Sequence, residues 1–280
     1  MHSTTLIYFL ILFAALCHAG WSSILKSKNS LGIMSITSIV EIIIFTPLVF
    51  YVPFPTKELW FYIIVSVILH GFYRLSVLYS YKLGDLSFVY PIARGSSSLL
   101  IATTTILLLN SQITLIGFIS ILIVSFGIYL ISYNKKYKFN RNAFVLASIT
   151  ALLITIYTII DGVGVRLSSN KFSYIFWMLL LNGIPVLILG IIKKEEAFSK
   201  INKSFIIYGL LAGILAILSY GIVVWSMQFL QIAYVSSIRE TSIIIATLIG
   251  YYFLGESKAK TRIVPSIFVI VGITLLYFQI

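Results

Sequence analysis

Long apolar windows, each close to twenty residues and bounded by Lys, Pro, Asn or Gly, follow one another along the whole chain. A transmembrane helix needs about 20 predominantly apolar residues, so each window can cross a bilayer once. Transmembrane β-strands would instead alternate apolar and polar residues in segments of about ten. The composition agrees, because 60% of the 280 residues are hydrophobic and 10% are charged. The windows predict an all-α integral membrane protein with ten transmembrane helices, at residues 4–25, 32–52, 58–81, 86–109, 113–133, 143–167, 172–192, 204–229, 233–254 and 262–280.

Basic residues are distributed unevenly between the loops that join these windows. Fourteen lysines and arginines fall on odd-numbered loops, whereas the even-numbered loops carry three, Lys57, Arg166 and Lys171. Cytoplasmic loops carry the excess of Lys and Arg in membrane proteins. We therefore expect a multi-pass protein of the cell inner membrane with both termini outside. The net charge of +12 then reports topology and not a nucleic-acid partner.

Several catalytic and metal-binding classes are excluded by the residue counts. Cys17 is the single cysteine, so the chain has no intramolecular disulfide and no cysteine cluster for zinc or iron–sulfur. Neither the HExxH pattern nor the phosphate-binding GxxxxGK[ST] pattern occurs. We expect no enzyme activity, no catalytic residues, no metal and no cofactor.

A basic connector at residues 135–142 separates five windows from five, which predicts one five-helix repeat at 1–134 and a second at 143–280. An offset of 145 pairs Arg94 with Arg239 and Gly127 with Gly272, and the Arg-to-Gly spacing is 33 residues in both halves. Because five is odd, the second copy enters the membrane from the opposite side. Inverted repeats around a central cavity are the architecture of alternating-access transporters, although a duplication without mechanistic meaning would leave the same pattern.

Six charged residues fall at membrane depth, where each costs about 2.5 to 3.5 kcal/mol on insertion scales. Their charges sum to zero, which a purely structural network of ion pairs would also produce. We expect two of the arginines to lie near opposite mouths of a central pathway and to bind substrate or a carboxylate in alternation. The carboxylates are candidates for proton coupling, because carboxylates withdrawn from water can exchange protons near physiological pH. The arginines are Arg74, Arg94 and Arg239, of which the last two are the mouth residues, and the carboxylates are Glu41, Asp161 and Glu240.

Helical spacing groups further polar and aromatic side chains with these charges. Residues three or four apart share one face of a helix, which joins His18 to Trp21, Tyr90 to Arg94, His70 to Arg74 and Tyr157 to Asp161. Polar faces in a bilayer turn toward the interior of the bundle. The candidate substrate-binding residues are His18, Trp21, Arg74, Tyr90, Arg94, Asp161, Arg239 and Glu240.

Two short stretches carry a recognisable pattern: Tyr90-Pro91-Ile92-Ala93-Arg94-Gly95 at the start of the fourth window, and Gly250 to Gly255-Glu256 at the end of the ninth. With the five-plus-five layout, they resemble the EamA-type branch of the drug/metabolite transporter superfamily. The resemblance implies that the first, third, fourth, sixth, eighth and ninth helices surround a substrate cavity, with the fifth and tenth outside. The chain departs from the family with Asn110-Ser111 where Gly-Glu is usual and Ser236 where proline is usual.

We expect a secondary active transporter that moves a small polar, zwitterionic or anionic metabolite, such as an amino acid or an amine-containing compound, as a monomer or homodimer. Arginines favour an anionic group, and the carboxylates can hold a cationic one. The rival is a multidrug exporter in which Trp21, Tyr73, Tyr90 and Trp225 form an aromatic cage for lipophilic cations. Substitution of Arg94 should abolish binding only under the first interpretation. A lipid flippase or an intramembrane enzyme is a less favoured alternative.

Overall fold

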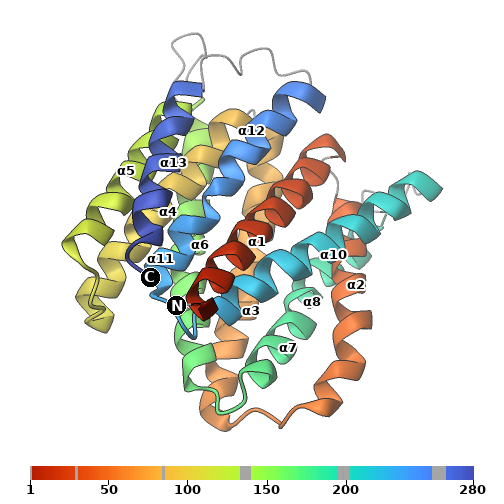
Figure 1. Cartoon of the computed structure of the whole chain (residues 1–280). Coiled ribbons are helices and arrows are strands. Elements are labelled where there is room, and N and C mark those ends of the chain that lie inside the picture. Colours follow the sequence, from red (N-terminus) through yellow and green to blue (C-terminus); the bar gives the residue numbers. More distant parts are fainter. Residues whose placement is uncertain are drawn as a thin grey trace.

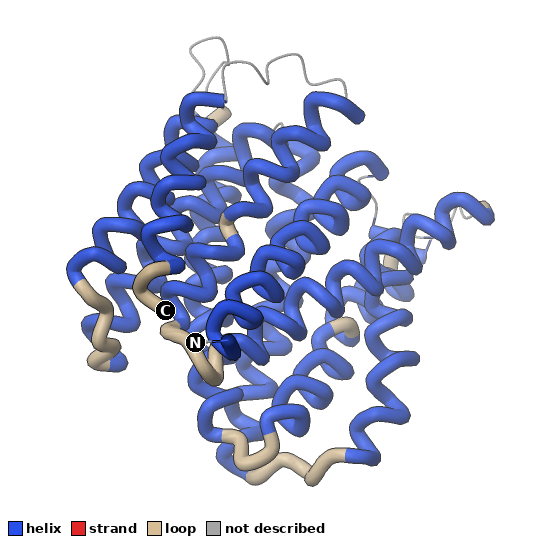
Figure 2. Tube along the Cα trace, viewed as in Figure 1, coloured by secondary structure: helices blue, strands red, loops and turns tan. Residues whose placement is uncertain are grey.

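The computed structural model describes residues 2–28, 31–83, 86–132, 140–194, 198, 202–253 and 263–280. Within these ranges the regular elements are all helices, and they run roughly side by side as one bundle (Figures 1 and 2). The helices are α1 (His2–Lys28), α2 (Leu31–Leu48), the 3-10 helix η1 (Val49–Tyr51), α3 (Lys57–Leu83), α4 (Leu86–Leu109), α5 (Leu115–Ser132), α6 (Arg141–Leu167), α7 (Lys171–Asn182), α8 (Ile184–Ile192), α10 (Lys203–Ser226), α11 (Ile232–Arg239), α12 (Thr241–Phe253) and α13 (Ile263–Tyr277).

Seven stretches of these described residues are long and apolar enough to cross a membrane. They are Thr4–Lys28, Leu31–Tyr51, Lys57–Ser80, Ile92–Leu109, Arg141–Leu167, Lys171–Ile192 and Lys203–Ser226. Two shorter apolar helices, Leu115–Ile131 and Pro265–Tyr277, lie at the positions of the expected fifth and tenth spans. The prediction of an all-helical membrane protein is therefore confirmed.

Two windows that we expected to be continuous helices are interrupted. The window at 172–192 is divided between α7 and α8 at Gly183, and Pro185 follows in the first turn of α8. Proline has no backbone N–H, so the hydrogen-bond ladder of α7 cannot continue through it. The window at 233–254 is divided at Glu240, where Glu240 N donates to Ser237 O and Ile243 N donates to Glu240 O. These i to i−3 bonds make one tight 3-10 turn inside the span.

Glycines allow α5 and α13 to pack closely at one side of the bundle (Figure 1). A Cβ atom added at Gly127 of α5 would lie 3.0 Å from the carbonyl oxygen of Pro265 and 2.9 Å from Val269 in α13. One added at Gly272 of α13 would lie 2.8 Å from a backbone oxygen of α5 and 2.7 Å from Val124. Val124 and Val269 differ by 145 residues, as the two glycines do. The contact is therefore reciprocal, as in a two-fold interface.

This packing predicts that Gly127→Ala and Gly272→Ala destabilise the protein, because each new methyl group would press on backbone atoms of the facing helix. Overpacking of this kind costs about 1–3 kcal/mol. The measurement is the thermal unfolding midpoint of the detergent-purified protein. Gly221→Ala is the matched control, since its Cβ would meet the nearest atom at 3.6 Å, and alanine favours a helix by about 1 kcal/mol over glycine. Equal midpoints for all three variants would contradict the close packing.

Candidate functional site

A cavity of about 440 Å³, counting the part that opens to solvent, lies in the interior of the bundle. Seven helices contribute to its wall: α1, α2, α3, α6, α7, α10 and α11. The lining residues are His18, Trp21, Glu41, His70, Tyr73, Arg74, Tyr157, Leu179, Asn182, Ala216, Tyr220 and Arg239. We call this space the central cavity.

One ion pair on the wall of the central cavity joins α2 to α3. The guanidinium of Arg74 donates from Nη2 to Oε1 of Glu41, and from Nη1 to the hydroxyl of Ser38 at 3.4 Å. Both charged side chains are buried. The second carboxylate oxygen of Glu41, Oε2, has no hydrogen-bond partner among the described residues.

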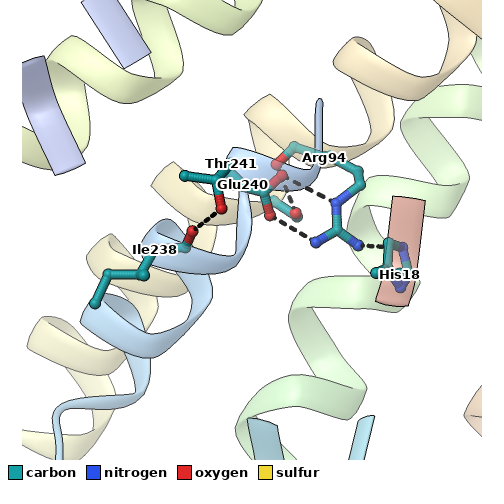
Figure 3. A network of polar contacts seen from close by, with 6 residues as sticks. His18, Arg94, Ile238, Glu240 and Thr241 are labelled. Atoms are coloured by element: carbon teal, nitrogen blue, oxygen red, sulfur yellow. Dashed lines mark hydrogen bonds and ion pairs between the residues drawn. The ribbon is translucent and has the colours of Figure 1, made fainter. Parts of the chain in front are cut away.

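A second ion pair lies beside the cavity and joins α4 to the turn between α11 and α12 (Figure 3). Arg94 donates from Nε to Glu240 Oε2 at 2.9 Å and from Nη2 to Oε1 at 3.0 Å, the two-bond geometry in which arginine binds carboxylates most strongly. The remaining terminal nitrogen, Nη1, lies 3.0 Å from Nε2 of His18 in α1. Because arginine can only donate, His18 accepts this bond through Nε2.

The carboxylate of Asp161 in α6 is held by hydrogen-bond donors instead of an arginine. Tyr174 donates its hydroxyl to Oδ1 at 2.7 Å, Tyr220 donates to Oδ2, and Nε2 of His70 lies 3.1 Å from Oδ2. Asp161 is fully buried and lies one hydrogen bond behind the cavity wall, to which His70 and Tyr220 belong. Three donors from α3, α7 and α10 thus take the place of a counter-ion.

Arg239 is the one buried arginine, among the described residues, for which no ion pair is found. Its side chain is 1% exposed and lines the central cavity. Nε and Nη2 have no hydrogen-bond partner within the part of the chain that the structure describes. The guanidinium carbon lies 5.9 Å from the centre of the Tyr220 ring, which is a weak cation–π distance. The cavity therefore presents unused hydrogen-bond donors that carry a positive charge.

The candidate residues fall into three groups according to their position relative to the central cavity. His18, Trp21, Arg74 and Arg239 line the central cavity, as does Glu41. Asp161, Arg94 and Glu240 lie behind its wall, and Arg94 lines a second cavity of about 260 Å³ that shares Tyr73 with the central one. The side chain of Tyr90 lies outside the described residues, as do residues 135–139 of the connector and Gly255-Glu256.

The cavity wall also contains residues that we did not single out from the sequence. Asn182 and Tyr220 each interrupt an apolar window, next to Gly183 and Gly221, and that polar interruption could have marked them. Leu179 and Ala216 carry no such mark. The helices differ from those that the family resemblance implied, because α2 and α7 contribute lining residues and α4 contributes none among the described residues. Of the two arginines that we expected at the mouths of the pathway, Arg239 lines the central cavity and Arg94 does not.

A helical bundle with seven candidate membrane spans and charged residues around an interior cavity defines a multi-pass membrane protein. Among the described residues, no three His, Cys, Asp or Glu side chains group closely enough to hold a metal ion.

Comparison with known proteins identifies the family. Residues 141–278 match the EamA-like transporter family, which belongs to the drug/metabolite transporter superfamily. A solved crystal structure, described only as that of a protein, superposes with a TM-score of 0.75 at 13% identity, covering 100% of this chain and 98% of the other. That likeness establishes a shared fold. No curated protein sequence matches the chain.

The Arg94–Glu240 pair predicts strong coupling between the two positions. Removing one partner leaves a buried charge uncompensated, which costs about 3–5 kcal/mol. Arg94→Met and Glu240→Met should therefore each lower the unfolding midpoint sharply, and the double variant should lose much less than the sum of the two. Unfolding midpoints of the four proteins in detergent measure this cycle. Strictly additive losses would contradict the pairing.

Proposed function

We propose that the protein is a secondary active transporter that moves a small anionic or zwitterionic metabolite by alternating access, with Arg239 binding the anionic group. The observation that carries the proposal is the guanidinium of Arg239 in the central cavity, which has no ion-pair partner and no hydrogen-bond partner for Nε and Nη2 among the described residues. A cation held away from water is costly unless it is paired. An anionic group on Nε and Nη2 would supply the missing partner, because guanidinium binds carboxylate and phosphate through two parallel bonds.

Two inverted five-helix repeats, at 1–134 and 143–280 with a connector at 135–142, belong to the same proposal. α5, α13 and the α11–α12 pair would add three spans to the seven long ones. Helix contacts support the repeat, because they occur in pairs that the 145-residue offset relates. The packing of α3 on α6 corresponds to that of α10 on α1, and the packing of α4 on α6 to that of α12 on α1. The reciprocal glycine contact of α5 and α13 supports it as well.

The interrupted spans also support transport. Discontinuous helices in transporters expose helix ends near the middle of the membrane, where substrate binds. α7 ends at Asn182 and α11 ends at Arg239, and both of these residues line the central cavity. The excess of Lys and Arg on the odd-numbered loops supports a cell inner-membrane protein with both termini outside.

Proton coupling is proposed for Asp161 with His70. Of the three carboxylates that we considered, Glu41 and Glu240 are each bound to an arginine. Asp161 instead contacts an imidazole and two hydroxyl groups. The His70 ring lines the cavity and its Nε2 lies 3.1 Å from Oδ2 of Asp161, so this pair offers a proton path between the cavity and the buried carboxylate.

An aromatic cage for lipophilic cations is the second candidate function. The observation that favours it is the set of rings in the cavity wall, which includes Trp21, Tyr73, Tyr157 and Tyr220. Trp225, a member of the cage that we expected, is not among the lining residues and packs against Phe229 at 4.9 Å between ring centres. Arg239 also lies in this wall and has no ion-pair partner among the described residues, and its charge disfavours a cation that carries no anionic group.

Ligand-dependent thermal stability separates the two functions. We expect some amino acids or phosphorylated metabolites to raise the unfolding midpoint of the wild type, since a ligand at 100 times its Kd stabilises the folded state by about 2.7 kcal/mol. Arg239→Gln should lose this response, whereas Arg141→Gln, an exposed residue at the start of α6, should keep it. A response to tetraphenylphosphonium alone that survives Arg239→Gln would contradict the proposal and support the cage.

A further inference from the structure

The central cavity contains unpartnered acceptors as well as unpartnered donors. Oε2 of Glu41 and Oδ1 of Asn182 are buried and have no hydrogen-bond partner among the described residues. Both residues line the same cavity as Arg239, and their exposed fractions are 1% and 2%. Buried polar atoms in native proteins are nearly always hydrogen-bonded, so three such residues around one cavity indicate groups that a ligand satisfies.

The two acceptor residues lie in the same part of the wall, where α2 meets α7. Gly183, directly after Asn182, approaches α2 so closely that an added Cβ would lie 2.8 Å from Cα of Ser38. Ser38 precedes Glu41 by three residues and so lies on the same face of α2. Asn182 and Glu41 thus come from two helices that are in close contact, and both side chains line the central cavity.

The carboxylate of Glu41 is held in place by its other oxygen. Arg74 binds Oε1, and the same guanidinium reaches Ser38 one turn earlier on α2 at 3.4 Å. This anchoring fixes the carboxylate and leaves Oε2 for another donor. α7 also ends at Asn182, and the carbonyl end of a helix favours a positive charge nearby.

These features differ in chemistry from those of Arg239. Carboxylate and amide oxygens accept hydrogen bonds, and an ammonium group offers three N–H donors together with a positive charge. Arg239 supplies only donors, from a different helix, α11. Neither a simple carboxylic acid nor a simple amine satisfies both sets of atoms.

We infer that the central cavity is a two-pole site for a substrate that carries both a primary ammonium group and an anionic group, with Glu41 and Asn182 binding the ammonium and Arg239 binding the anion. The inference rests on the proposed transport function and narrows its substrate class to zwitterions. It assigns the ammonium subsite to the contact between α2 and α7.

Matched ligands test the two poles. The first probes are the standard amino acids and phosphoethanolamine. Each probe that stabilises the purified protein is then compared with two analogues, one without its amino group and one without its anionic group. Titrations followed by the unfolding midpoint give the apparent Kd of each. We expect removal of either group to weaken binding by tenfold or more in the wild type.

Variants then locate the ammonium subsite. We expect Asn182→Ala and Glu41→Gln to raise the apparent Kd of the complete zwitterion. They should also reduce the ratio between the Kd of the deaminated analogue and that of the zwitterion. Asn182→Ala leaves no charge unpaired, so it keeps the test informative if Glu41→Gln fails to fold. Asn142→Ala, an exposed asparagine in the first turn of α6, is the matched control and should behave as the wild type.

The outcomes separate this inference from the proposed function. Deaminated analogues that bind as tightly as the zwitterions, with binding still abolished by Arg239→Gln, would overturn the ammonium subsite and leave an anion transporter. The same holds if Asn182→Ala and Glu41→Gln leave the preference for zwitterions unchanged. Binding that does not depend on Arg239, or no response to any probe, would overturn both.

Discussion

Every charged side chain that this chain places at membrane depth must meet an opposite charge, a set of hydrogen-bond partners or a ligand, because an unpaired charge there is costly. The six buried charges meet this demand differently. Arg74 binds Glu41 and Arg94 binds Glu240, whereas Asp161 accepts from two tyrosines and lies against His70. Arg239 has no ion-pair partner among the described residues, and its Nε and Nη2 atoms have no hydrogen-bond partner there. The six charges sum to zero, yet they are not all paired with one another. The arginine without an ion pair is the one that lines the central cavity beside Tyr220.

The same demand explains why the α11–α12 span is interrupted where it is. Arg239 and Glu240 are adjacent, yet one lines the central cavity and the other binds Arg94 of α4 behind the wall. Because of the tight turn at Glu240, Arg239 can line the central cavity while the adjacent Glu240 binds Arg94. A turn of 3-10 geometry within a helix often marks a hinge, and this one joins the proposed anion site directly to an ion pair that holds α4.

Much of the fold could be predicted from apolar window length alone, as the agreement of α4 with the window at 86–109 illustrates. The charge inventory also named Arg74, Arg239 and Glu41, because buried charges are rare and therefore informative. Sequence could not give the pairing: nothing in the spacing says that Asp161 would receive tyrosine hydroxyls while Glu240 received Arg94. Asn182 and Tyr220 were missed since their role arises from contacts between helices that are distant in the chain.

The most direct test of the account is counterflow in proteoliposomes containing the purified protein. Vesicles are loaded with the unlabelled amino acid or phosphoethanolamine that stabilises the protein most, and the labelled compound is added outside. The account predicts transient, saturable accumulation of chemically unchanged label, which is absent from vesicles carrying Arg239→Gln. Accumulation that is unaffected by Arg239→Gln, conversion of the label to another compound, or no accumulation above protein-free vesicles would contradict it.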